Sequence, residues 1–237
     1  MIYLGNKKIT DLNYGGTPIK EAYFGSTLVW RKQALEGTHN LHSWVDLGLP
    51  SGTLWANMNI GANTYYDYGE HFAFGEISKK LTYTAENYAH YGMAIGEFSG
   101  QERFDAARAN WGGGWRTPTD DEISELNRYC TTRIVQLTDN FGQAQSVCRI
   151  QGTNGKSIYM PLAGYYNGES FIEGGIKGHY WSSTPYTSGT GDLYNAYDLN
   201  VVTAIPTNDN NHLYITTSAR WLGHTIRPVL DRSSLES

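Results

Sequence analysis

The sequence contains few cysteines and no long apolar segment. Its two cysteines, Cys130 and Cys148, are too few for a disulfide scaffold and lack the Cys-x-x-Cys or Cys/His spacing of a zinc site. We expect both to be buried thiols, with a single disulfide as the alternative. No stretch of about 18 apolar residues occurs, and the first residues lack the basic and apolar regions of a signal peptide. These absences predict a soluble chain without membrane insertion or export by a signal peptide.

Charge is also scarce. Charged residues make up 17% of the 237 residues, below the globular average of about 25%. The net charge is -5 and no cluster of Lys and Arg occurs, which argues against nucleic acid as a partner. Tyrosine (18), tryptophan (7) and glycine (27) are abundant instead. This composition favours short strands and turns, and its aromatic rings suit recognition at low entropic cost.

Motifs that carry catalysis or bind metals are missing. The seven histidines form no His-Glu-x-x-His or His-x-His pair, and no calcium-loop or phosphate-loop spacing occurs. Ser182 and Ser183 lack the flanking glycines of a nucleophile elbow. Asp67, Glu70 and Glu76 could form an acid/base pair of a glycosidase, although spacing alone does not bring them together. We therefore expect a protein without enzymatic activity, bound metal or cofactor.

The first thirty residues contain a repeat with a ten-residue step. "YLGNKKI", "NYGGTPI" and "YFGSTLV" each place a glycine where a tight hairpin requires positive φ. The repeat predicts a β-meander of about four strands over residues 1–32, which serves as an attachment module or packs on the main domain. A polar linker (33–44) follows, then a large domain (45–230) and a short tail (231–237).

The large domain combines one clear helix with β structure. Thr119 and Glu122 form a capping box, and Ile123, Leu126 and Cys130 share one helical face, so a helix from about 120 to 130 is predicted. Asn154-Gly155 lies between two alternating apolar runs and predicts a hairpin. Residues after 163 show no helical period. Together these patterns predict an α+β domain behind a small all-β N-terminal module.

The C-terminal region uses a restricted set of residues. The 53 residues from Gly178 to Leu230 contain no Lys, Glu, Gln or Met, although residues 1–177 contain 29 of them, so about nine are expected by composition. The residues present are mostly those reached by changing adenines in Asn codons that end in a pyrimidine. Lys, Glu, Gln and Met are not reachable in this way. The alternative is a polar β region that avoids long charged side chains.

Five motifs stand in order along the chain: "VDLGLPSGTLWA" (45–56), "YGEHFAFGE" (68–76), "GGGWRTPTDDEISEL" (113–126), "GHYWSST" (178–184) and "RWLGHTIRPV" (220–229). In this order they resemble the motifs of the C-type-lectin-fold domains related to formylglycine-generating enzymes, which are abundant in Bacteroidetes and their phages. Within that family, the C-terminal frame resembles the variable region of proteins diversified by retroelements.

The resemblance implies a rigid C-type-lectin-like scaffold that displays diversified side chains to a ligand. Trp181, Arg220, Gly223 and Arg227 would belong to the framework. The N-terminal repeat is similar to modules that begin phage tail proteins, so the whole chain resembles a tail-tip adhesin. The implied ligand-binding residues are Tyr186, Thr187, Ser188, Asp192, Tyr194, Asn195, Tyr197, Asn200, Thr203, Asn208, Asn210, His212 and Tyr214.

Several expectations about partners and location follow. The receptor would be a protein or glycan on a bacterial surface, and the N-terminal module would join other tail or virion proteins. The chain would be made in the host cytoplasm and reside in the virion, with a homotrimer as one option for its oligomeric state. Two alternatives stay open, namely a structural virion or cell-surface assembly protein and a formylglycine-generating type of oxidase, which would need a reactive cysteine.

Overall fold

The computed structural model describes residues 3–4, 7–8, 11–31, 34–138, 144–187, 192–203 and 211–235. The chain divides into two compact units, Met1–Leu35 and Glu36–Ser237. Within the described ranges, no helix has both the length and the apolar character needed to cross a membrane.

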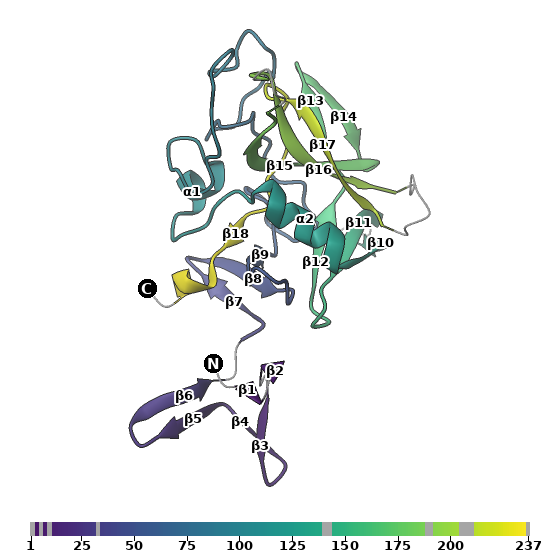
Figure 1. Ribbon diagram of the computed structural model, residues 1–237. Coiled ribbons are helices and arrows are strands. Elements are labelled where there is room, and N and C mark those ends of the chain that lie inside the picture. Colours follow the sequence, from purple (N-terminus) through teal and green to yellow (C-terminus); the bar gives the residue numbers. More distant parts are fainter. Residues whose placement is uncertain are drawn as a thin grey trace. The chain divides into compact units, whose positions relative to one another are not determined.

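The first unit consists of short antiparallel hairpins (Figure 1). Gly15 and Gly25 occupy turns with φ of 56° and 61°, as the ten-residue repeat predicts. The described strands form three separate two-stranded pairs, where the sequence predicts a continuous meander of about four strands. The pairs are β1 (Tyr3–Leu4) with β2 (Lys7–Lys8), β3 (Leu12–Tyr14) with β4 (Thr17–Ile19), and β5 (Glu21–Phe24) with β6 (Thr27–Arg31).

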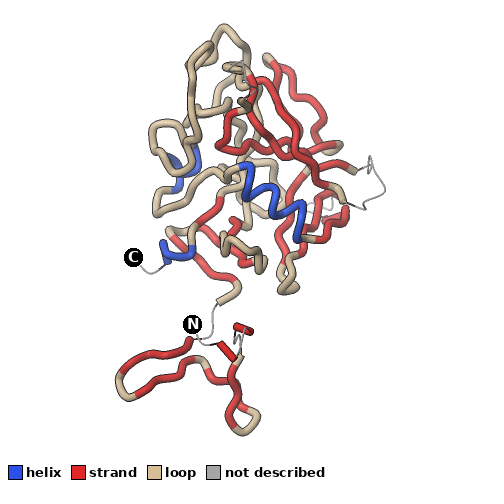
Figure 2. Tube along the Cα trace, in the orientation of Figure 1, coloured by secondary structure: helices blue, strands red, loops and turns tan. Residues whose placement is uncertain are grey.

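The predicted α+β class is wrong, because the protein is mostly β, with 43% of residues in strands and 10% in helices. Figure 2 shows strands and loops throughout, with few helical segments. The described residues contain two α-helices, α1 (Ala106–Trp111) and α2 (Asp120–Tyr129), and a 3-10 turn at Arg232–Leu235. The helix prediction for 120–130 is confirmed, but one strong helix does not form a helical layer, and the Gly-rich and β-branched remainder forms sheets.

The described residues of the second unit form three sheets. The segment expected as a linker (33–44) contributes to the first of them. The first, four-stranded sheet has the order β18 (Val229–Leu230), β9 (Leu54–Ala56), β8 (His42–Asp46), β7 (Glu36–His39). The second, three-stranded sheet has the order β10 (Thr131–Thr138), β11 (Ala144–Gln151), β12 (Ser157–Pro161). The third, five-stranded sheet has the order β14 (Ser170–Gly174), β13 (Ala163–Asn167), β15 (Lys177–Pro185), β16 (Asn195–Val202), β17 (Leu213–Ala219).

The sequence-predicted hairpin is confirmed, since β11 and β12 pair antiparallel around Asn154 and Gly155. The principal core lies between α2, the three-stranded sheet and β15 to β17 of the five-stranded sheet (Figure 1). Both cysteines are free and buried, Cys148 within β11 and Cys130 just after α2. A second core, rich in aromatic rings, contains Trp115, Phe74 and Trp181.

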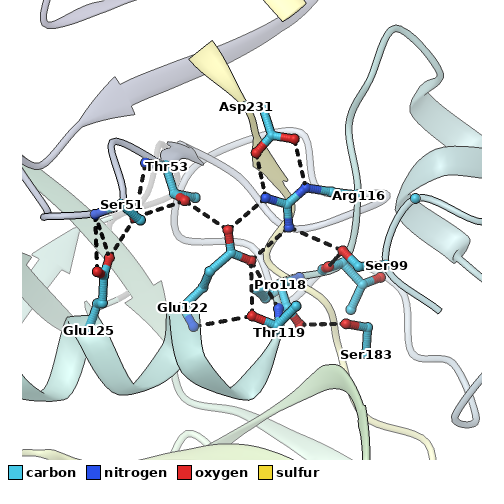
Figure 3. Close-up of polar contacts among 12 residues, drawn as sticks. Ser51, Thr53, Ser99, Arg116, Pro118, Thr119, Glu122, Glu125, Ser183 and Asp231 are labelled. Carbon is cyan, nitrogen blue, oxygen red and sulfur yellow. Dashed lines mark hydrogen bonds and ion pairs between the residues drawn. The ribbon is translucent and has the colours of Figure 1, made fainter. Parts of the chain in front are cut away.

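An ion network of the largely buried Arg116 and Glu122 with the exposed Asp231 fixes the start of α2. Thr119 and Glu122 form the predicted capping box. The Arg116 guanidinium donates to both Glu122 carboxylate oxygens, at 2.6 and 2.7 Å, and also pairs with Asp231 at 2.6 Å (Figure 3). Burial opposes ionisation of Glu122, but the hydrogen bonds and charge of Arg116 lower its pKa below the usual range. The network therefore links α2 to the segment expected to be a tail (231–237).

Candidate ligand-binding surface

The expected contact residues do not form one patch. Ten of the thirteen lie in the described part of the chain; Ser188, Asn208 and Asn210 lie outside it. Strand β16 places Asn195 and Val202 seven residue steps apart, or about 24 Å. Alternation along the strand also sends Tyr197 and Asn200 to opposite faces of the sheet. The ten residues therefore divide into a group near Tyr194, a pair on the other face, and a group at the far end.

Tyr194 belongs to an aromatic patch, defined here as Tyr91, Tyr194 and the partly buried Trp221. Tyr194 is 43% exposed and Tyr91 is 53% exposed. The Tyr91 ring lies 5.1 Å from that of Tyr194 and 6.1 Å from that of Trp221, measured between centroids. Of these three residues, the sequence pointed to Tyr194 alone. Tyr91 comes from a loop about a hundred residues earlier, and Trp221 lies in the motif "RWLGHTIRPV" (220–229) but was not among the expected contact residues. The tyrosine-rich run around Tyr91 was the available signal.

Arg220 holds the main chain beneath the patch. Its side chain is almost fully buried, and it donates to the carbonyl oxygens of Asn195 (2.9 Å), Met93 (3.3 Å) and Asp192 (3.3 Å). Its own backbone N–H donates to the Tyr194 carbonyl at 2.8 Å. The guanidinium also lies over the Phe74 ring at 5.3 Å. This arginine therefore fixes both chain segments that carry the two tyrosines, in agreement with the framework role expected for it.

Asp192 and Asn195 form a turn rather than projecting freely. The Asp192 carboxylate accepts from the Asn195 side-chain amide (2.6 Å) and from the backbone N–H groups of Tyr194 (2.7 Å) and Asn195 (3.1 Å). The Asn195 side chain and the Tyr194 backbone, as donors, lower the pKa of Asp192. These bonds orient the entry to β16 and thereby the Tyr194 ring.

Tyr186 and Tyr197 lie next to this turn, on the side of the sheet that faces α2. Both are half-buried, and their rings meet edge to face at 5.5 Å. Thr187 follows and is exposed. The preceding serines are buried: Ser182 Oγ donates to the Tyr197 carbonyl (2.8 Å), and Ser183 Oγ to the Pro118 carbonyl (3.2 Å). Their hydroxyls stabilise the frame, as the absence of a nucleophile elbow predicts.

The remaining residues lie elsewhere. Asn200 is buried, donates to Asp198 Oδ2 (2.7 Å) and accepts from the Tyr214 hydroxyl (3.2 Å), so its amide is not on the surface. At the far end of β16, Thr203 is exposed, while His212 Nδ1 lies 2.7 Å from the Val202 carbonyl. Asn200 and Tyr214 therefore lie on the face of the sheet opposite α2 and do not belong to the aromatic patch.

The cysteines offer little as nucleophiles. Burial raises the pKa of both Cys130 and Cys148 to about 12. A thiol with such a pKa is protonated near neutral pH and reacts poorly. The geometry therefore gives no support to the oxidase alternative.

No family model matches this chain, and neither the curated proteins nor the solved structures yield a match. The functional interpretation therefore depends on the residues of this chain and their geometry.

Proposed function

We propose that this chain is a receptor-binding protein that presents its diversified C-terminal segment on a mostly β scaffold, as an adhesin of a phage tail tip. The observation that carries the proposal is the aromatic patch. Exposed tyrosines with their main chain fixed give a large contact area at low entropic cost, as in antibody loops. The receptor would be a protein or glycan on a bacterial surface.

The arrangement of fixed and variable parts supports this function. Trp181, Arg220 and Arg227 are each about 1% exposed, and a side chain at Gly223 would collide with the Tyr83 ring at 2.9 Å. These positions stand among residues of the restricted alphabet. Buried framework residues that alternate with replaceable surface residues suit a protein whose binding specificity changes while its fold stays constant.

The N-terminal unit suits attachment to other tail or virion proteins. Tyr14 and Phe24 occupy the same position of the ten-residue repeat, directly before a turn glycine, and are 82% and 83% exposed. Two such rings offer anchors for a protein partner. Tyr14→Ser with Phe24→Ser should reduce incorporation into virions, scored by immunoblotting of purified particles, while leaving binding to cells unchanged.

The aromatic patch is tested by the double variant Tyr91→Ala/Tyr194→Ala. We expect binding of the labelled protein to a bacterial strain that the parent binds to fall at least tenfold, since each hot-spot ring contributes about 1–2 kcal/mol. Surface truncation should change the free energy of unfolding by less than about 0.5 kcal/mol per residue.

Tyr129→Ala provides the matched control, because Tyr129 is a 40% exposed tyrosine on α2 outside the patch. It should bind cells like the parent. Equal loss of binding in the control and the double variant would contradict a specific role of the patch.

A further inference from the structure

Three ionisable side chains converge on the face of the five-stranded sheet that carries Asn200. His179 comes from β15, Asp198 from β16, and His224 from the segment after β17. The Nδ1 atoms of both histidines lie 3.6 Å from Asp198 Oδ2, and one donor atom from each residue lies within 4.8 Å of the other two. Two imidazoles and one carboxylate form a donor set typical of zinc and related ions.

Three of the four histidine ring nitrogens in this cluster lack hydrogen-bond partners among the described residues. His224 is fully buried, and among the described residues neither of its ring nitrogens has a partner; the same holds for His179 Nδ1. A separation of 3.6 Å is too long for a hydrogen bond. Leaving buried polar atoms unpaired costs about 1–3 kcal/mol each, and such groups are rare in folded proteins. The lone pairs are therefore available for coordination of an ion.

The surrounding contacts orient the donors in the manner of a metal site. His179 Nε2 lies 2.8 Å from Glu173 Oε2, which directs the opposite nitrogen, Nδ1, toward Asp198. Asn200 Nδ2 donates to Asp198 Oδ2 at 2.7 Å. A carboxylate that accepts from the outer nitrogen of a histidine is the usual support of a metal ligand, because it fixes the tautomer and the ring orientation.

The backbone and the adjoining rings hold the cluster in place. His224 pairs through its backbone with Phe72 in both directions, at 2.8 and 3.1 Å, and His179 accepts from Thr225 N–H at 3.2 Å. The Trp181 ring stacks on His224 at 4.0 Å, and the Tyr165 ring meets His179 at 4.8 Å. Burial of the cluster beside these rings lowers the local dielectric constant, which strengthens the attraction between an ion and its ligands.

We propose that His179 Nδ1, Asp198 and His224 Nδ1 bind one Zn²⁺ ion. Zinc suits the set because it accepts nitrogen and oxygen donors and has no geometric preference from its d electrons. Bonds of about 2.1 Å place tetrahedral donors about 3.4 Å apart, close to the 3.6 Å that separates each nitrogen from the carboxylate. The widest donor separation, up to 4.8 Å, has to shorten when the ion binds. The ion joins β15, β16 and the segment after β17. This site is independent of the proposed receptor binding.

The site is tested on the full chain, produced without a polyhistidine tag and freed of metal with a chelator. Titration calorimetry with Zn²⁺ should give one ion per chain, and Mg²⁺ or Ca²⁺ should not compete, since these ions prefer oxygen ligands. X-ray absorption of the zinc-loaded chain should count two imidazole nitrogens at about 2.0–2.1 Å. Absence of stoichiometric uptake, or fewer than two imidazoles, would overturn the proposal.

Variants locate the ion. Asp198→Asn and His224→Leu should weaken zinc binding at least 100-fold, and Glu173→Gln should weaken it 10- to 100-fold by releasing the His179 ring. The Glu173 side chain is 27% exposed. Glu173→Gln therefore still tests the site if Asp198→Asn and His224→Leu impair folding. His90→Asn is the control, because His90 contacts the Gly75 carbonyl outside the cluster. Zinc affinity that is unchanged in Glu173→Gln, or equally reduced in His90→Asn, would refute the assignment.

Discussion

The two faces of strand β16 are both covered but differ in chemistry. The face toward α2 is apolar: Leu199 and Val201 pack there against Leu213. The opposite face carries Asp198 and Asn200 among histidines and aromatic rings. Burial of apolar groups stabilises a fold directly, whereas buried polar groups stabilise it only when paired. The comparison indicates that the apolar face supplies most of the stability, whereas the polar face carries the unpartnered atoms of the proposed zinc site.

The largest effect is expected on the apolar face. Leu199→Ala should lower the free energy of unfolding by about 2–5 kcal/mol, because it leaves a cavity in a closely packed core. Thr217→Ala, at an exposed position of the adjacent strand β17, should change it by less than about 0.5 kcal/mol. Urea unfolding measures both. A small loss for Leu199→Ala would show that this face is not the source of stability.

Glu122 is a buried carboxylate whose oxygens are paired, so its replacement should lower the free energy of unfolding more than replacement of an unpaired group on the polar face. Glu122→Gln removes a charged partner of Arg116 and should cost about 1.5–3 kcal/mol at neutral pH. Because the folded pKa of Glu122 is lowered, the stabilisation is fully present above the unfolded pKa of about 4.3 and is lost as pH falls through the folded value. Urea unfolding of parent and variant between pH 7 and pH 3 should therefore show their difference shrinking toward acid. A difference independent of pH would contradict the ionic origin.

The smallest effect is expected on the polar face. His224→Leu replaces unpartnered buried nitrogens with an apolar group of similar volume, so in metal-free buffer the free energy of unfolding should change by less than about 1.5 kcal/mol. Added Zn²⁺ should raise the thermal midpoint of the parent but not of the variant. A loss in metal-free buffer comparable to that of Leu199→Ala would remove the distinction between the two faces.

Local features of the sequence predicted local structure well. The Thr119–Glu122 capping box located α2, and Asn154-Gly155 located the β11–β12 hairpin, because caps and tight turns depend on residues a few positions apart. The predicted α+β class was wrong, because the helix that the capping box marks does not form a layer and the rest of the chain is mostly β. Strand propensity depends on neighbours that are distant in sequence.

The candidate sites were partly hidden for the same reason. The restricted alphabet drew attention to Tyr194 but not to Tyr91, which comes from a remote loop. His179, Asp198 and His224 are separated by 19 and 26 residues, and no short motif contains them. Strand register brings them together: Trp181 pairs with Asp198 in the β15–β16 ladder, which places His179 diagonally beside Asp198 on the same face.

The bonds made by Arg220 have a consequence for how this protein can change over generations. Its three acceptors are main-chain carbonyls of Met93, Asp192 and Asn195, and every amino acid supplies such an oxygen. Substitution of the Met93 side chain therefore leaves its bond to the arginine in place. At Asp192 and Asn195 the same holds for residues that still form the turn between them. Under the proposed diversification, side chains at these positions could therefore vary without a compensating mutation at Arg220.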